Sequence, residues 1–213
     1  MHEAIKKKYN VLAPRVVNAL KNRFFDAYYC ETAEEVLPLV LSLIPKEHTV
    51  SFGGSETLRA LGIIDSVRTA GYTMLDRDSA KSTEERNEIM RRALLCDTFL
   101  TGTNAVSADG VLINIDGNGN RVGAMTYGPH SVIVVVGMNK VTQTREEAYL
   151  RARHVAAPMV IQRFPNLETP CMKTGMCADC KSPMCICSYI VETRMCRPAG
   201  RIKVILVGEE LGL

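Results

Sequence analysis

Two stretches of this chain are apolar at nearly every position. They are VIVVVG, residues 132–137, and IKVILVG, residues 202–208. A strand with one face in water alternates apolar and polar residues, whereas a strand that is covered on both faces does not. The two stretches therefore predict central strands of a mostly parallel sheet between two layers of helices. Four shorter strands are predicted near Thr49–Phe52, Thr73–Leu75, Thr98–Leu100 and Val111–Ile115.

Helical signals alternate with these strands. An N-terminal helix is expected over roughly residues 3–22, and a Ser or Thr followed three residues later by Glu marks three further helix starts. These pairs are Thr32 with Glu35, Ser82 with Glu85, and Thr144 with Glu147. The alternation predicts an α/β architecture. The stretch GVLINIDGNGNRVGAM interrupts it, and we expect a hairpin or tight loop at DGNGN between two short strands.

Composition and charge narrow the class of protein. The chain has 213 residues, of which 46% are hydrophobic and 23% charged, as in one soluble domain with a sizeable core. A net charge of +3 without a basic stripe argues against nucleic-acid binding. The apolar runs are shorter than the roughly 20 residues of a membrane helix, and no signal peptide opens the chain. We therefore expect a cytoplasmic protein without nucleic-acid or membrane partners.

Five of the eight cysteines lie between positions 171 and 187, in the stretch CMKTGMCADCKSPMCIC. In a reducing cytoplasm, clustered cysteines hold metals more often than they form disulfides. The two-residue spacing of Cys177 and Cys180 lets both thiolates face one ion or cluster. Four ligands complete either a zinc site or a four-iron cluster, and the preferred set is Cys171, Cys177, Cys180 and Cys187. Cys185 and Cys196 stay open as replacements for a member of this set.

The spacing alone leaves both zinc and an iron-sulfur cluster open. A single CxxC pair and the lack of a histidine favour a 4Fe-4S iron-sulfur cluster, with zinc as the alternative. Residues 168–198 contain too few apolar side chains to offset roughly 1–2 kcal/mol of backbone entropy per residue. We therefore expect a metal-stabilised insertion that precedes a strand returning to the sheet. Cys30 and Cys96 are interpreted as small core residues.

The stretch SFGGSETLRALG places Gly53, Gly54 and Ser55 between a strand and a helix that contains Thr57. Free amides and the positive end of a helix dipole in such a turn favour an anion. The alternative is a tight turn with Ser55 as the helix N-cap. Further along, Asp109 and Asn114 are expected to contact a ligand at the carboxyl edge of the sheet, with simple turn capping as the alternative.

Three segments, SFGGSETLRALGI, TGTNAVSADGVLINIDGNGNRVGAM and GPHSVIVVVGMNKV, together resemble the LUD (lactate utilisation) domain proteins. The resemblance implies one domain over residues 1–213, a three-layer α/β sandwich like ribose-phosphate isomerase and the CoA transferases. It implies ligand contacts from the glycine turn and from the loop that ends in Arg121. The motifs TPC and TGxCxDC point to the same four cysteines. Cys185 departs from the family pattern, where Arg is expected, and adds a competing thiolate.

Three functions are compatible with these observations. The first, implied by the family name, is an iron-sulfur protein that takes part in oxidation of lactate or a related 2-hydroxy acid. Arg121, Arg194 and Arg197 are candidate partners for its carboxylate. The second is a non-redox isomerase or acyl-transfer enzyme for a phosphorylated metabolite, with a structural zinc. The third is a metabolite-binding module. The first implies a redox partner protein, the fold is compatible with a homodimer, and no catalytic residue is assigned.

Overall fold

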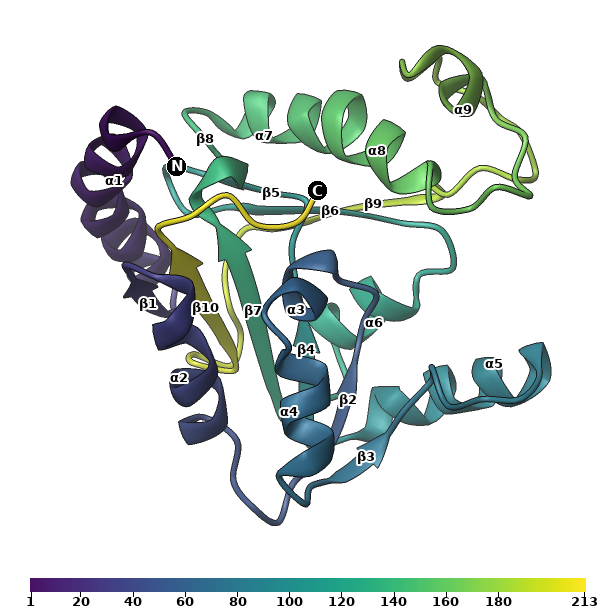
Figure 1. Ribbon diagram of the computed structural model, residues 1–213, viewed down its shortest axis with the longest axis horizontal. Coiled ribbons are helices and arrows are strands. Elements are labelled where there is room, and N and C mark those ends of the chain that lie inside the picture. The colour runs from purple at the N-terminus through teal and green to yellow at the C-terminus, as the bar shows by residue number, and fades with distance from the viewer.

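The computed structural model describes residues 1–213, and its centre is a six-stranded sheet in which every neighbouring pair is parallel (Figure 1). The strands follow the spatial order β1 (Asp26–Cys30), β10 (Ile202–Val207), β7 (Ser131–Gly137), β4 (Thr98–Thr101), β2 (Thr49–Phe52) and β3 (Thr73–Leu75). The two apolar stretches of the sequence are β7 and β10, which lie side by side. The prediction of central, fully covered strands is confirmed.

Helices cover both faces of this sheet, because the side chains of its strands alternate between two cores. Val132 and Val134 point toward α1 (Glu3–Asn22) and α6 (Asn120–Thr126). Ile133 and Val135 point to the other face, which is packed by α2 (Val36–Ser42), α3 (Glu56–Ala60) and α4 (Ile63–Thr69). The three-layer α/β architecture expected from the sequence is therefore present.

The three expected helix starts have different outcomes. At Thr144, which begins α7 (Arg145–Arg151), both hydrogen bonds of a capping box are formed with Glu147. At Ser82, which begins α5 (Thr83–Arg92), the serine hydroxyl accepts a hydrogen bond from the Glu85 amide. The Glu85 carboxylate accepts from the backbone amide of Lys81 rather than from that of Ser82. At Thr32 a helical segment begins as predicted, but the Thr32 side chain makes no capping hydrogen bond. A 3₁₀ turn over 33–35 comes first, and the Glu35 carboxylate accepts from the Glu31 amide.

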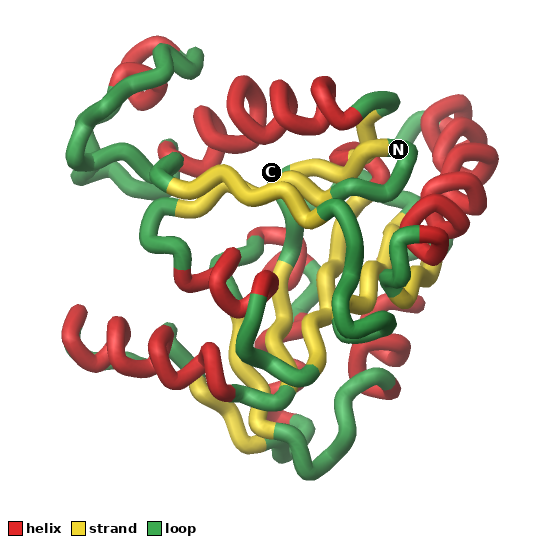
Figure 2. Tube along the Cα trace, turned by 180° about the vertical axis from the view of Figure 1, so that it is seen from behind, coloured by secondary structure: helices red, strands yellow, loops and turns green.

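A second, smaller sheet lies above the first and was not predicted (Figure 2). Its order is β8 (Val141–Thr142), β5 (Ala105–Ser107), β6 (Leu112–Asp116) and β9 (Tyr189–Thr193). It is covered by α7, a π-helical turn over Ala152–Ala156, and α8 (Ala157–Ile161). The expected hairpin at DGNGN is wrong, because after β6 the chain enters α6 rather than a second strand. Asp116 favours this, since its carboxylate accepts from amides at the start of α6.

The cysteine-rich segment begins with α9 (Pro170–Thr174) and continues without regular structure to β9. Figure 1 shows α9 at the far end of the molecule from α1. Within the expected insertion, 168–198, β9 pairs with β6 of the small sheet. The chain then returns to the centre of the main sheet as β10, as predicted. Short 3₁₀ turns cover 93–95 and 138–140. None of the helices is both long and apolar enough to cross a membrane.

Candidate functional site

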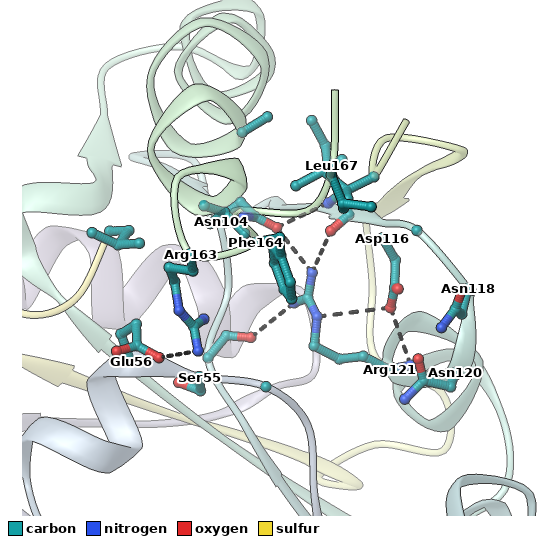
Figure 3. Close-up of a pocket in the computed structure, with 18 of the residues that line it drawn as sticks. Ser55, Glu56, Asn104, Asp116, Asn118, Asn120, Arg121, Arg163, Phe164 and Leu167 are labelled. Atoms are coloured by element: carbon teal, nitrogen blue, oxygen red, sulfur yellow. Dashed lines mark hydrogen bonds and ion pairs between the residues drawn. The ribbon is translucent and has the colours of Figure 1, made fainter. Parts of the chain in front are cut away.

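The main cavity lies where the parallel strands of the large sheet end at their carboxyl edge. Its volume is about 520 Å³. Residues that follow β2, β3, β4 and β7 form its floor, and α8 with the cysteine segment forms its opposite wall. Ligands of α/β proteins bind at this edge of the sheet. Figure 3 shows the Arg163 side chain directed toward Glu56, with Ser55 beside the pair.

The glycine turn after β2 contributes to this cavity through Gly54 and Ser55. Ser55 is also the N-cap of α3, because its hydroxyl accepts from the Leu58 amide at 3.3 Å. Gly53 permits close packing, since a Cβ atom there would lie 3.0 Å from the Arg121 side chain. Thr57 is fully buried behind the turn. The turn is thus both a helix cap and part of the cavity wall.

Arg121 is held rigidly at the cavity by four protein oxygens. Its guanidinium donates to the carbonyls of Gly102 and Ile115 and to the side-chain oxygens of Asn104 and Asn114. Asn114 is fully buried, does not line the cavity, and has an unpartnered Nδ2 atom. Among the residues expected from the sequence, Arg121 therefore faces the cavity and Asn114 positions it from behind.

Three other expected residues lie away from the cavity. Asp109 is in the turn before β6, at the opposite end of that strand from Asp116, and its carboxylate pairs with Arg23 at 2.5 Å. Burial raises the pKa of Asp109. A hydrogen bond from Ser107 and the charge of Arg23 outweigh burial, so the pKa is lowered overall. Arg194 and Arg197, the other candidates for carboxylate binding, do not line the cavity either.

Four arginines that the sequence did not single out converge on the cavity: Arg59, Arg77, Arg86 and Arg163. They share two carboxylates. Asp78 lies within ion-pair distance of Arg59, Arg77 and Arg86, at 2.7, 3.7 and 3.2 Å, and Glu56 pairs with Arg59 and Arg163. The group therefore keeps an excess of positive charge, which favours an anionic ligand. No motif links these residues, because they are spread from α3 to the end of α8.

Arg77 is the least compensated of the four. Its side chain is 14% exposed and its Nε atom has no hydrogen-bond partner. Burial and the neighbouring charge of Arg86 lower the pKa of Arg77. It lies against the glycine turn, since a Cβ atom at Gly54 would come within 2.9 Å of its Nη2 atom. Arg77 is thus placed to bind an anion that enters the cavity.

Lys140 is a further cavity residue that sequence reasoning missed. It ends the 3₁₀ turn that follows β7, is 4% exposed, and donates from Nζ to the Thr57 hydroxyl at 3.2 Å. Burial, together with the charges of Arg151 and Arg121, lowers its pKa to about 8. The burial of this lysine can be recognised only once the fold is known, because the surrounding sequence GMNKV is that of an ordinary strand end.

The five clustered cysteines line one small cavity beside the first. Its volume is about 90 Å³, and its walls include Cys171, Cys177, Cys180, Cys185 and Cys187. Cys30, Cys96 and Cys196 are instead buried in the cores. This places Cys196 outside the group and keeps Cys185 within it. All eight cysteines are free thiols, and no three side chains stand in a preassembled metal-binding arrangement.

The thiols of this group influence one another. Burial, reinforced by the nearby Cys185, Cys177 and Cys171, raises the pKa of Cys187 to about 12. Cys177 differs. Burial raises its pKa, but hydrogen bonds from Arg153 at 3.4 Å and from the Asp179 backbone, with the charge of Arg153, together outweigh burial and lower it. Thiolates are the donors that a soft metal ion or an iron-sulfur cluster takes. The donor chemistry of this group therefore fits such a centre, although no three of its thiols are assembled around one point in this structure.

The two cavities share part of their wall. Cys185 and Ile186 line both the arginine-rich cavity and the thiol-lined cavity. Ile186 also packs on the loop after β6, since a Cβ atom at Gly117 would lie 3.4 Å from its Cα. A ligand in the larger cavity is therefore separated from the thiol group by little more than this one turn of chain.

A parallel sheet between two helical layers, with a cavity at the carboxyl edge, defines a three-layer α/β protein. The chain belongs to the LUD domain family, whose model matches residues 13–207. A DUF162 family protein from Deinococcus radiodurans is similar in structure, with a TM-score of 0.55 and 17% identity over 93% of this chain and 98% of that one.

Two more distant structures also match. Ribose 5 phosphate isomerase A from Neisseria gonorrhoeae has a TM-score of 0.33 and 13% identity over 54% of this chain and 52% of its own. The eIF2B delta protein from Chaetomium thermophilum has a TM-score of 0.36 and 14% identity over 64% and 57%. A search of the curated proteins found no match. The family model confirms the family expected from the sequence, and the likeness to the Deinococcus protein, at 17% identity, concerns the fold alone.

Proposed function

We propose that this protein binds an anionic 2-hydroxy acid, such as lactate, in the arginine-rich cavity and takes part in its oxidation with an iron-sulfur cluster. The observation that carries the proposal is the shared wall, because Cys185 and Ile186 line both cavities. A cationic cavity suits a carboxylate, and a thiol-lined one suits a soft metal centre. Their adjacency would bring a redox centre and an oxidisable anion together.

Cys171, Cys177, Cys180 and Cys187 would hold the cluster, and Cys185 is the competing fifth thiol at the same cavity. When bound, a 4Fe-4S cluster supplies one-electron transfer. The chain's own residues would bind and orient the acid. Arg77 and its neighbours attract the carboxylate, and the apolar side chains of Phe164 and Leu167 restrict water at the cavity. Electrons would leave through a redox partner protein.

Elemental analysis of anaerobically purified protein tests the metal centre. We expect iron and acid-labile sulfide, with visible absorption that dithionite bleaches. A colourless protein that carries one zinc ion would contradict the redox proposal and would support a structural zinc. Unstructured residues 175–188 would become protected from protease when the metal is bound, which gives a second readout.

Calorimetric titration with lactate tests the ligand. Lactamide is the matched control, since it has the same shape without the negative charge. We expect lactate to bind and lactamide not to bind, and added salt to weaken lactate binding, because the arginine cavity acts through charge. Equal binding of the two compounds would contradict the proposed role of the arginines.

A second candidate function is supported by the size of the cavity. Its volume of about 520 Å³ is in the range of sites for larger ligands. A phosphorylated metabolite or a CoA-like ligand at the glycine turn would fill it better than a three-carbon acid, and the function would then be isomerisation or acyl transfer with a structural zinc. Titrations with ribose 5-phosphate and CoA, beside lactate, distinguish the two functions by which compound binds.

A further inference from the structure

Lys140 ends the 3₁₀ turn that follows the central strand β7, on the floor of the arginine-rich cavity. The 3₁₀ turn over Met138–Lys140 directs the chain from the main sheet toward β8 of the small sheet. Lysine is almost never buried to this extent unless a carboxylate pairs with it. Here the only side-chain contact of its Nζ atom is the hydroxyl of Thr57.

The charged groups that shift the pKa of Lys140 are both positive, while the carboxylates that line the same cavity, Glu56 and Asp116, are each within ion-pair distance of arginines. Arg151 comes from α7 and Arg121 from α6, and no carboxylate lies within ion-pair distance of Nζ. Neither arginine is free to move away. Arg151 is held by the carbonyl of Asn104 at 2.5 Å, and Arg121 by the four oxygens described above. A buried amine among fixed positive charges favours its neutral form, which has a lone pair to accept a proton.

We propose that the Lys140 amine accepts the hydroxyl proton of the 2-hydroxy acid bound in this cavity, an inference that rests on the proposed function. The O–H bond of the ligand breaks, an N–H bond forms at Nζ, and the oxygen keeps the electron pair as an alkoxide. The fixed charge of Arg121 stabilises that alkoxide, and the ammonium returns its proton to water. This step moves one proton and no electrons, so it needs no oxidant.

Thr57 is the positioning residue of this step. Its hydroxyl accepts one hydrogen bond from Nζ and is itself fully buried. One N–H bond of the amine is thereby directed away from the cavity, which leaves the lone pair to point elsewhere. The carbonyl of Leu211 lies 3.5 Å from the same hydroxyl, so the last residues of the chain help to hold it.

Titration calorimetry of lactate in buffers with different ionisation enthalpies measures proton uptake on binding. At about pH 8, near the pKa of Lys140, the wild-type protein is expected to take up a fraction of a proton with lactate, because the bound carboxylate raises that pKa. The fraction of Lys140 that stays neutral is the base, so the rate of oxidation is expected to rise with pH above this value. Lys140→Arg keeps the positive charge but cannot gain a proton, so it is expected to bind lactate without uptake. Lys140→Met is expected to bind more weakly, also without uptake. Equal uptake by wild type and Lys140→Arg would overturn the inference.

The rate of lactate oxidation with a dye as electron acceptor gives the second readout. Lys140→Arg is expected to lose roughly 10²–10⁴-fold in rate while still binding lactate, because a general base contributes this much. Thr57→Val is expected to shift the pH profile rather than remove activity. If wild type does not bind lactate, the proposed function fails. If wild type binds and oxidises lactate but Lys140→Arg is as fast, only the role of Lys140 fails.

Discussion

The guanidinium of Arg153 donates hydrogen bonds to the Sγ atom of Cys177 at 3.4 Å and to the carboxylate of Asp179 at 2.6 Å. Arg153 belongs to the π-helical turn between α7 and α8, so this contact joins the helical layer of the small sheet to the cysteine segment. The pKa of Arg153 is raised by these bonds. The contact orients the CxxC pair before any metal is present.

Replacement of this arginine tests that role. We expect Arg153→Met to loosen residues 175–188, because hydrogen bonds to a charged group contribute about 1.5–3 kcal/mol. The measurement is the rate of tryptic cleavage after Lys181, followed by mass spectrometry. Arg145→Met is the matched control, since Arg145 pairs with Glu192 on β9 rather than with the cysteine segment. Equal cleavage rates in the two variants would show that Arg153 does not order the segment.

The grouping of thiols predicts which cysteines retain metal. Four single substitutions by Ala are expected to lower the amount of iron or zinc bound per chain strongly. The cysteines replaced are Cys171, Cys177, Cys180 and Cys187. Cys30→Ala is the control, because Cys30 is buried in the core away from the group. Metal content per chain is measured by mass spectrometry of the elements. The metal content of Cys185→Ala decides whether the fifth thiol is also a ligand. Full metal content in the Cys177 variant would exclude the proposed ligand set.

Arg77 is expected to contribute most to anion binding among the cavity arginines, because its charge is buried and poorly paired. Arg77→Met should weaken lactate binding by about 10–100-fold, the equivalent of a charged hydrogen bond. Arg91→Met is the control, since Arg91 lies on the exposed side of α5 and pairs with Glu88. Calorimetric titration measures both. An unchanged affinity in the Arg77 variant would place the anion elsewhere in the cavity.

Lys140 gives a pH-dependent prediction that is independent of any ligand. Its pKa is about 8 in the folded protein against 10.5 as the ordinary value. Between these values the unfolded chain binds more protons, so the stability of the wild type rises with pH. Lys140→Met removes this dependence. It should stabilise the fold by an amount on the order of 3 kcal/mol below pH 8, with the gain vanishing above pH 10.5.

Urea unfolding of wild type and Lys140→Met across this pH range measures the difference. Lys203→Met is the control, because Lys203 is only partly buried and hydrogen-bonds the Ser131 hydroxyl and the Gly200 carbonyl. Its effect should not change in the same pH window. A stability difference for Lys140→Met that is constant with pH would mean that folding does not lower the pKa of Lys140.

The main sheet was largely predictable because strands that are buried on both faces can be recognised from short apolar stretches of the sequence. A strand between two helical layers needs apolar side chains on both faces, and the segments at β7 and β10 satisfy this within six or seven residues. The strands β5, β8 and β9 of the small sheet have no such apolar pattern. Each contains only two to five residues, too few for a pattern to be recognised. DGNGN was misjudged for a related reason: glycine and asparagine suit a strand–helix turn as well as a hairpin.

The sequence by itself determined the family, the α/β class, the glycine turn at Gly53–Ser55 and the group of cysteines, because each depends on residues close together in the chain. Only the tertiary structure decided the rest. It brought Arg77, Arg163 and Lys140 to one cavity, and it left Asp109 at the far end of β6 beside Arg23. The physical reason is that crossovers between parallel strands collect their carboxyl ends at one edge, so residues far apart in the chain meet there.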